Sequence, residues 1–196
     1  MTMTARTLVN ASTADVNADL MDANYDDLSP NSVTLRKSIP SPYKGLVYDE
    51  SFFVTSYKDN VVPPALPHSP PQIAVFTQLS PDLEAVSVIT TTNGQVMDLS
   101  GFYFGCALDD FNNVASVGVD CSILVTGFSG LEQVTQETFS YTFAGVGSAM
   151  QEVADLGKLG FAGLDKLTFQ IVNTELPATL YSVGLDDLTY TLSSVV

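Results

Sequence analysis

From about residue 73 onward, the chain alternates apolar and polar positions with the two-residue period of half-buried strands. In residues 138–143, for example, three aromatic side chains alternate with Thr and Ser. Runs rich in Val, Ile, Thr, Tyr and Phe predict strands at residues 73–76, 85–91, 95–99, 101–108, 119–127, 133–143, 166–172 and 179–192. Turn sequences such as Asn93-Gly94 and Ser129-Gly130 separate these runs. We therefore expect an all-β fold, a two-sheet antiparallel β-sandwich of the jelly-roll kind.

The segments outside these runs predict loops, a flexible end and little helix. Residues 148–159 are the best helical candidate, with Met150, Val153 and Ala154 on one side, so we expect at most one or two short helices. Residues 61–71 hold five of the ten prolines, which is too dense for a central strand and predicts an ordered surface loop around His68. The polar residues 1–24 predict a flexible N-terminal segment, which leaves residues 25–196 as a single β-sandwich domain.

The composition supports one buried core and excludes several partners. Of the 196 residues, 45% are hydrophobic and only 15% are charged. The 22 acidic residues outnumber the 7 basic ones, which gives a formal net charge of −15. Phosphate backbones and anionic membranes repel so acidic a chain, and we expect no nucleic-acid partner. We also expect no membrane span, because the sequence has no run of about 20 apolar residues.

The two cysteines bear on the compartment. Cys106 and Cys121 each lie in an apolar, strand-like run, and two adjacent strands would bring their Cα atoms within reach of a disulfide. Two buried free thiols are the alternative. A disulfide indicates an oxidising compartment. Residues 1–23 lack the features of a signal peptide, so either the chain is cytosolic or a signal has already been removed. We favour the second alternative, with secretion or passage through the secretory pathway.

Most catalytic machinery needs residues that this chain lacks. Ser-His-Asp and Cys-His nucleophiles, like catalytic zinc or iron sites, need histidines, and His68 is the only one. Glycine motifs that bind nucleotides are absent as well. The many carboxylates leave a paired-carboxylate glycosidase open, although no pair stands out. We expect no cofactor for chemistry.

Two aspartate pairs are candidates for a structural calcium site. Asp26 and Asp27 begin the predicted domain, and Asp186 and Asp187 lie on the last predicted strand. The first and last strands of a sandwich are often neighbours, and carboxylates with backbone carbonyls suit Ca²⁺. The alternative is that one aspartate of each pair caps a turn while the other is exposed to solvent.

Residues 42–53 concentrate aromatic side chains beside a lysine, which is typical of a site that grips a flat ligand. Ordinary core packing is the alternative, and we favour it for Phe52 and Phe53 taken singly. The candidate catalytic hydrogen-bond donors are Lys44, Tyr43, Tyr48 and Arg36. The candidate ligand-binding side chains are Phe52, Phe53, Tyr57, His68, Tyr103 and Phe104.

Several short motifs resemble those of a group of secreted fungal β-sandwich proteins, over about residues 25–192. They are Tyr25-Asp26-Asp27-Leu28, residues 40–46 with Tyr48 and Phe52, Thr126-Gly127-Phe128, and the closing stretch 184–190. The resemblance implies a jelly roll similar to galactose-binding, carbohydrate-binding-module folds, which often hold a structural calcium near the chain ends. It also implies a link to cofactor-free fungal hetero-Diels–Alderases of tropolone–sesquiterpenoid biosynthesis. Many members of the group have Trp where this chain has Tyr48.

Three functions stay open. The first is a cofactor-free hetero-Diels–Alderase or related cyclase of fungal secondary metabolism, which would orient a small apolar ligand and activate it by a hydrogen bond. The second is a noncatalytic carbohydrate-binding or cell-wall module for a neutral oligosaccharide. The third is a structural or adhesive surface protein. We place the enzyme first. A deep apolar pocket favours the cyclase, a shallow aromatic groove the module, and a filled sandwich the structural protein.

Overall fold

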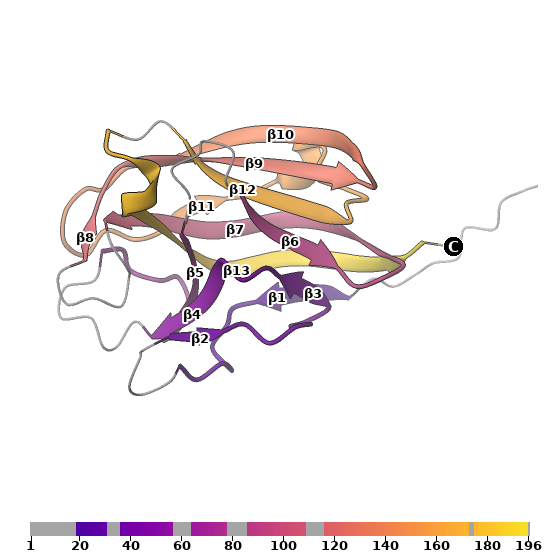
Figure 1. Cartoon of the computed structure of the whole chain (residues 1–196), viewed down its shortest axis with the longest axis horizontal. Helices are drawn as coiled ribbons and strands as arrows, with labels where there is room; N and C mark the ends of the chain where they lie inside the picture. Colours follow the sequence, from indigo (N-terminus) through magenta and orange to yellow (C-terminus); the bar gives the residue numbers. More distant parts are fainter. Residues whose placement is uncertain are drawn as a thin grey trace, which may run out of the picture.

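The computed structural model describes residues 19–30, 36–56, 64–77, 86–108, 116–172 and 175–195. Two antiparallel sheets pack into a β-sandwich, as the alternation of apolar and polar residues predicts (Figure 1). The eight-stranded sheet has the order β11-β7-β13-β5-β4-β2, with β1 paired to β13 and β8 paired to β7. Its strands are β1 (Leu20–Ala23), β2 (Arg36–Ser38), β4 (Phe52–Ser56), β5 (Gln72–Thr77), β7 (Gln95–Leu108), β8 (Val117–Gly118), β11 (Gln151–Val153) and β13 (Tyr181–Ser194).

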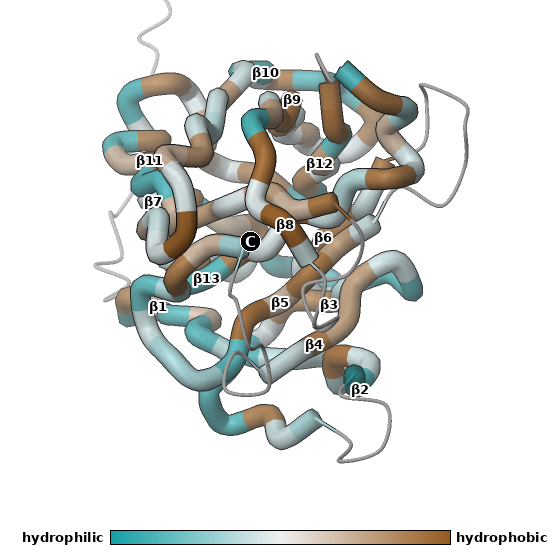
Figure 2. Tube along the Cα trace, turned by 90° about the vertical axis from the view of Figure 1, so that its left-hand side faces the viewer, coloured by the Kyte–Doolittle hydropathy of each residue, from teal (hydrophilic) through white to brown (hydrophobic). Residues whose placement is uncertain are grey.

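The five-stranded sheet has the order β10-β9-β12-β6-β3. Its strands are β3 (Leu46–Tyr48), β6 (Ser87–Thr91), β9 (Cys121–Ser129), β10 (Glu132–Tyr141) and β12 (Lys166–Val172). The ring of Phe169 in β12 lies 5.7 Å from Phe76 of β5 and 6.0 Å from Phe102 of β7. Because Phe76 and Phe102 belong to the other sheet, these contacts place the core between the two sheets. Figure 2 shows the apolar stretch of β5 in brown within this interior.

The helical prediction for residues 148–159 is wrong. Helical backbone in the described ranges is limited to two 3-10 turns, η2 (Leu156–Leu159) and η3 (Ala178–Leu180). Residues 151–153 form β11 and pair with residues 102–104 of β7. Two left-handed residues, Asp155 (φ 60°) and Gly160 (φ 86°), then confine the helical backbone to the single turn η2 between them. Within the same ranges, no helix has the length and apolar character needed to cross a bilayer.

A disulfide joins Cys106 of β7 to Cys121 at the start of β9, which confirms the predicted pairing. The two cysteines do not lie on neighbouring strands of one sheet, as the spacing suggested, but on the two facing sheets. Their Cα atoms are 6.2 Å apart and 15 residues apart in sequence. A cross-link that closes a loop of this length lowers the conformational entropy of the unfolded chain, which stabilises the folded protein by about 3 kcal/mol. The bond fits an extracellular protein.

The first described strand lies in a segment that the sequence predicts to be flexible. β1 pairs with residues 188–191 of β13, so strand structure begins before residue 25. Its four residues show no clear alternation of apolar and polar side chains. The main-chain pairing with β13 therefore defines this strand. The pairing makes the first and last described strands neighbours, as expected. The rest of the predicted flexible segment, residues 1–18, lies outside the described ranges.

Candidate functional site

The site begins where β13 changes its partner. Residues 182–185 pair with β5, and residues 188–191 pair with β1, while β7 lies along the other edge of both stretches. Asp186 and Asp187 fall between the two pairings, and the register against β7 shifts there as well. Asp187 has a left-handed backbone conformation (φ 46°), which a residue with a side chain adopts only where its surroundings hold it. This irregularity turns both carboxylates toward the loop before β5.

Both carboxylates bind the proline-rich loop. Oδ2 of Asp186 accepts the backbone N–H of Ser69 at 2.8 Å, and Oδ1 accepts the Ser69 hydroxyl at 3.0 Å. Oδ1 of Asp187 accepts the same hydroxyl at 2.7 Å, and its Oδ2 lies 2.5 Å from Nδ1 of His68. These side-chain hydrogen bonds attach the loop to β13 between its pairings with β5 and with β1. These contacts fix the position of His68.

Several carboxyl groups gather at this point of the fold, and two of them have raised pKa values. Asp186 is fully buried, and burial raises the pKa of its carboxyl to about 7, with a further contribution from Asp187 and against the hydrogen bonds from Ser69. Asp22 of β1 lies nearby at the surface. Partial loss of solvent around its carboxyl, followed by the charge of Asp187, raises its pKa as well. Both pKa values rise, as expected for carboxyl groups that lose contact with water and lie near other negative charges.

His68 stacks on Tyr103 of β7. Their ring centroids are 3.9 Å apart and their planes differ by 5°. The His68 side chain is 53% exposed, so much of this ring is open to solvent. Glu152 of β11 lies opposite Tyr103 in the strand register, and burial together with this carboxylate raises the pKa of the Tyr103 hydroxyl. An exposed, planar and fixed aromatic surface thus lies among carboxylates.

A cleft of about 320 Å³ opens beside this ring pair. We call it the carboxylate cleft, and its defining residues are Asp22, His68, Tyr103, Glu152 and Asp187. Gly101 also lines it, where β11 approaches β7 closely. A Cβ atom at Gly101 would lie 2.6 Å from the carbonyl oxygen of Val153, so the glycine permits this approach.

The aromatic segment at residues 42–53 begins with a tight hairpin turn. Lys44 (φ 48°) and Gly45 (φ 81°) are its central residues, and reciprocal backbone hydrogen bonds of 2.8 and 2.9 Å join Tyr43 and Leu46. Two successive left-handed residues are typical of a type I′ turn, whose twist matches that of paired strands. The turn leaves Nζ of Lys44 2.5 Å from the backbone carbonyl oxygen of Asp22, close to the carboxylate cleft.

Tyr43 and Tyr48 belong to the core, together with Tyr25 and Tyr190, in a group that we call the tyrosine cluster. The four side chains are at most 6% exposed. The Tyr43 hydroxyl donates to Oδ1 of Asp27 at 2.6 Å, and the Tyr25 and Tyr48 hydroxyls lie 3.1 Å apart. Burial is the main cause that raises the pKa of all four hydroxyls. The protein itself therefore engages the two tyrosine hydroxyls that the sequence offers as catalytic donors.

Three of the predicted site residues, His68, Tyr103 and Asp187, line the carboxylate cleft, and Asp186 binds the same loop beside it. The structure places Tyr43 and Tyr48 in the tyrosine cluster instead. Phe52 and Phe104 are buried core residues. The guanidinium of Arg36 lies 4.5 Å above the half-buried Phe53 ring. Nζ of Lys44 donates to the carbonyl oxygen of Asp22, and Tyr57 lies outside the described ranges. No sequence pattern distinguishes Asp22 or Glu152, because a single acidic residue in so acidic a chain carries no signal of its own.

The four aspartates proposed for calcium are engaged by the protein. Asp26 accepts the backbone N–H of Gln72 at 3.1 Å, and Asp27 accepts the Tyr43 hydroxyl. Asp186 and Asp187 bind the loop as described above. In the part of the chain that the structure describes, no three His, Cys, Asp or Glu side chains form a group that could hold a metal ion. Calcium binding stays a prediction.

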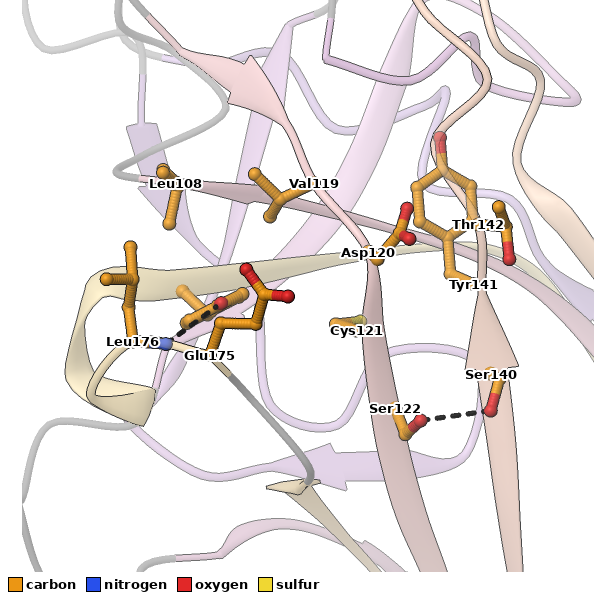
Figure 3. Close-up of a pocket in the computed structure, with 11 residues that line it drawn as sticks. Leu108, Val119, Asp120, Cys121, Ser122, Ser140, Tyr141, Thr142, Glu175 and Leu176 are labelled. Carbon is orange, nitrogen blue, oxygen red and sulfur yellow. Dashed lines mark hydrogen bonds between the residues drawn. The ribbon is translucent and has the colours of Figure 1, made fainter.

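A second pocket, of about 500 Å³, lies next to the disulfide (Figure 3). Its lining comes from the last residues of β7 and β10, the start of β9 and the start of β13, and includes Cys121. We call it the disulfide pocket. It shares no lining residue with the carboxylate cleft.

Fold and surface together define a β-sandwich protein with a carboxylate-lined cleft. No protein-family profile and no curated protein matches the sequence. Among solved structures, the chain is similar to a DUF4465 family protein from Bacteroides caccae, with a TM-score of 0.52 and 13% identity, over 88% of this chain and 92% of that one. At this identity the similarity is one of fold alone, and it agrees with the sandwich that the sequence predicts.

Two further structures match at lower TM-scores. A DUF4465 family protein from Bacteroides ovatus gives 0.43, with 13% identity over 94% of this chain and 96% of that one. The CBM22-1 and GH10 modules of a Clostridium thermocellum xylanase, solved with xylohexaose, give 0.35, with 8% identity over 81% of this chain and 28% of that one. Neither similarity is close enough to bear on function. None of the three structures connects the chain to fungal proteins or to Diels–Alderases.

Proposed function

We propose that this protein is a noncatalytic carbohydrate-binding module, and that the carboxylate cleft binds a neutral oligosaccharide. The observation behind the proposal is the stacked pair of His68 and Tyr103, fixed by Asp187 at the edge of the cleft. Aromatic faces present apolar area against the C–H faces of a sugar ring. Carboxylates nearby accept hydrogen bonds from sugar hydroxyls and fix the orientation of the ring.

The arrangement is organised before any ligand binds. Asp187 holds the His68 ring, and Tyr103 stacks against it from a central strand, so little side-chain freedom remains to be lost on binding. Asp22 on β1 and Glu152 on β11 are exposed and line the same cleft. The site thus combines a rigid ring surface with acceptors on two sides.

The cyclase hypothesis receives no comparable support. It requires a deep apolar pocket and a hydrogen-bond donor aimed into it. The carboxylate cleft and the disulfide pocket are open surface pockets with mixed polar and apolar linings. The hydroxyls of Tyr43 and Tyr48 bind Asp27 and Tyr25 instead. Secretion, suggested by the disulfide, is part of the proposal, because a carbohydrate-binding module meets its ligand outside the cell.

The test is isothermal titration calorimetry with neutral gluco-, xylo- and manno-oligosaccharides. Tyr103→Ala should weaken binding by about tenfold or more, because loss of one aromatic stacking surface in a small site removes a large share of the contact. Phe128→Ala is the matched control, since Phe128 is a half-exposed aromatic on the other sheet, with Nζ of Lys166 4.0 Å from its ring. The proposal is abandoned if none of the sugars binds, or if Tyr103→Ala binds as tightly as the parent. Parallel titrations with calcium and with a chelator test the calcium prediction.

A further inference from the structure

The disulfide pocket lies between the two sheets at the point where Cys106 and Cys121 join them. Its volume of about 500 Å³ falls within the range of small-molecule sites, roughly 300–1,000 Å³. Cys121 itself is buried and lines the pocket wall. Because the cross-link fixes β7 against β9, it limits the movement of the walls on either side. The pocket is therefore a preformed hollow on a rigid part of the sandwich.

One wall of the pocket is apolar. Leu108 ends β7, Val119 precedes β9, and Leu176 lies in the turn before β13. The Tyr181 ring begins β13, is 3% exposed, and its hydroxyl oxygen accepts the backbone N–H of Leu176 at 3.4 Å. That hydrogen bond holds the turn against the ring. Together these side chains offer an apolar surface suited to an aliphatic or aromatic body.

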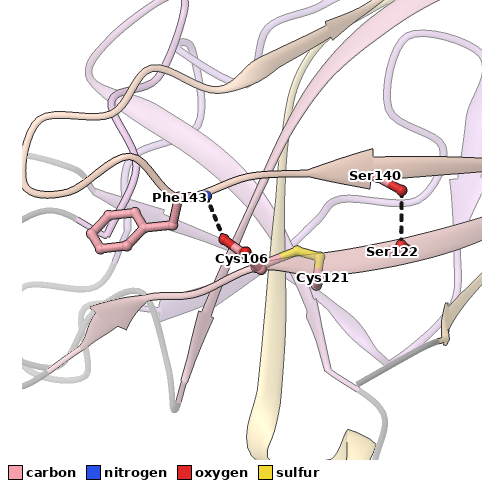
Figure 4. The surroundings of a disulfide bond; sticks show 6 residues. Cys106, Cys121, Ser122, Ser140 and Phe143 are labelled. Atoms are coloured by element: carbon pink, nitrogen blue, oxygen red, sulfur yellow. Dashed lines mark hydrogen bonds between the residues drawn. A yellow bond between two sulfur atoms is a disulfide. The ribbon is translucent and has the colours of Figure 1, made fainter. Parts of the chain in front are cut away.

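The opposite wall is polar, and its two serine hydroxyls pair with each other. The Ser122 and Ser140 hydroxyls lie 2.9 Å apart across β9 and β10 (Figure 4). Oδ1 of Asp120 accepts the backbone N–H of Phe143 at 2.7 Å, which fixes the Asp120 carboxylate at the pocket. The polar wall therefore carries a fixed negative charge that a ligand would meet.

Glu175 supplies the second charge. Figure 3 shows its side chain extending from the turn that also holds Leu176 toward the side of the pocket where Val119 and Cys121 lie. None of the lining residues is basic, and among the described residues no ion pair involves Glu175 or Asp120. The pocket therefore places two carboxylates beside an apolar wall, within a chain of net charge −15 that attracts cations.

We propose that the disulfide pocket binds a small amphiphilic amine. The ammonium group lies against Glu175 and Asp120, and the apolar or aromatic body lies against Leu108, Val119 and Tyr181. A neutral isostere lacks the charge-assisted hydrogen bonds to the carboxylates, and an anion meets repulsion from both. This site is separate from the carboxylate cleft, and the proposal does not depend on carbohydrate binding.

The test uses three probes of one shape and different charge: 2-phenylethylamine, 2-phenylethanol and 3-phenylpropionate. Amide chemical shifts followed by NMR during titration give both the affinity and the place of binding. The amine should bind about tenfold or more tightly than the alcohol, and the acid should not bind. The shifting amides should include those of residues 119–122 and Leu176, and exclude those of Tyr103 and Glu152.

Glu175→Gln keeps the size of the side chain and removes its charge. This exposed position is expected to tolerate the change, and the preference for the amine over the alcohol should fall by about tenfold. Glu152→Gln, in the carboxylate cleft, is the matched control and should leave amine binding unchanged. Equal binding of amine and alcohol, an unchanged preference in Glu175→Gln, or shifts confined to the carboxylate cleft would each overturn the proposal.

Discussion

The tyrosine cluster and the His68–Tyr103 pair place aromatic rings in opposite situations. In the cluster, four tyrosines are at most 6% exposed, and their hydroxyls bind partners inside the protein. In the pair, a 53% exposed imidazole lies flat against a half-buried phenol beside solvent-exposed carboxylates. The cluster thus satisfies its polar atoms internally, whereas the pair leaves a ring surface and several acceptors facing water.

This difference indicates what each group contributes. A buried tyrosine whose hydroxyl has a partner adds apolar contact area without the cost of an unpaired polar atom, so it stabilises the fold. An exposed ring buries little area and stabilises little, and the contacts that hold it rigid have to come from other residues. Asp187 provides that rigidity for His68. Variants in the two groups test whether stability and recognition are divided between them in this way.

The largest expected effect is on the cluster. Tyr48→Ala removes a ring that lies 5.4 Å from Phe52 and 6.1 Å from Tyr25, and should lower the free energy of unfolding by about 3–5 kcal/mol. Tyr48→Phe, which loses only the hydrogen bond to Tyr25, should cost about 1 kcal/mol. Urea denaturation measures both. If Tyr48→Ala stays stable and loses ligand binding, the cluster belongs to the site and the division fails.

The second effect concerns Asp186, which connects the loop of His68 to β13. Its pKa rises from 3.8 to about 7 on folding, so the folded protein keeps a proton that the unfolded chain releases between these values. The stability that this proton contributes is fully present below about pH 4 and is lost as the pH rises through about 7. At roughly 1.4 kcal/mol for each pKa unit, we expect a loss of about 2–4 kcal/mol over this range.

Asp186→Asn is the matching variant, because it cannot ionise. Urea midpoints measured between about pH 5 and pH 8 should fall with rising pH in the parent and change much less in the variant. An equal slope in both proteins would show that Asp186 is already ionised in the folded state at low pH. The loop would then be held by a buried charge, and His68 would lie in a different electrostatic setting from the one described here.

The later part of the fold follows from the sequence, whereas the earlier part depends on neighbours. Residues 166–172 alternate regularly, and β12 has those bounds. Residues 95–99 and 101–108, predicted as two strands, form the single strand β7, which pairs with β13 along both stretches. The strands β1 to β4 span only three to five residues each, and their pairing partners rather than any periodicity decide their conformation.

The candidate site was less accessible to prediction. His68 and Asp187 are 119 positions apart in the sequence. They meet where β13 changes its partner from β5 to β1, because the loop that carries His68 binds β13 at that point. No local pattern encodes that change. The aromatic density of residues 42–53 pointed to a site, yet core packing and a binding surface favour the same residue types. Glu152 was assigned to a helix, and its place beside Tyr103 follows from β11 being a strand.

The third effect concerns the stability of the turn that positions Tyr43 in the tyrosine cluster. Gly45 (φ 81°) would place a Cβ atom 2.5 Å from Cδ1 of Leu192. Gly94 (φ 76°) has a similar conformation but no atom within 4 Å of such a Cβ. Gly94→Ala should cost about 1 kcal/mol for the left-handed backbone alone, and Gly45→Ala about 1 kcal/mol more for the contact. Equal midpoints in urea would show that Leu192 moves aside freely.

The smallest effect is expected at Tyr103. Tyr103→Ala removes the ring beneath His68 but leaves the contacts of His68 and Ser69 with Asp187, so the loop keeps its attachment to β13. Because Tyr103 is partly exposed, the free energy of unfolding should fall by less than about 1 kcal/mol, well below the loss in Tyr48→Ala. Urea denaturation of the two variants side by side makes the comparison. A loss of similar size would mean that the His68–Tyr103 pair is a structural element like the tyrosine cluster, and that any loss of sugar binding in Tyr103→Ala reports unfolding rather than recognition.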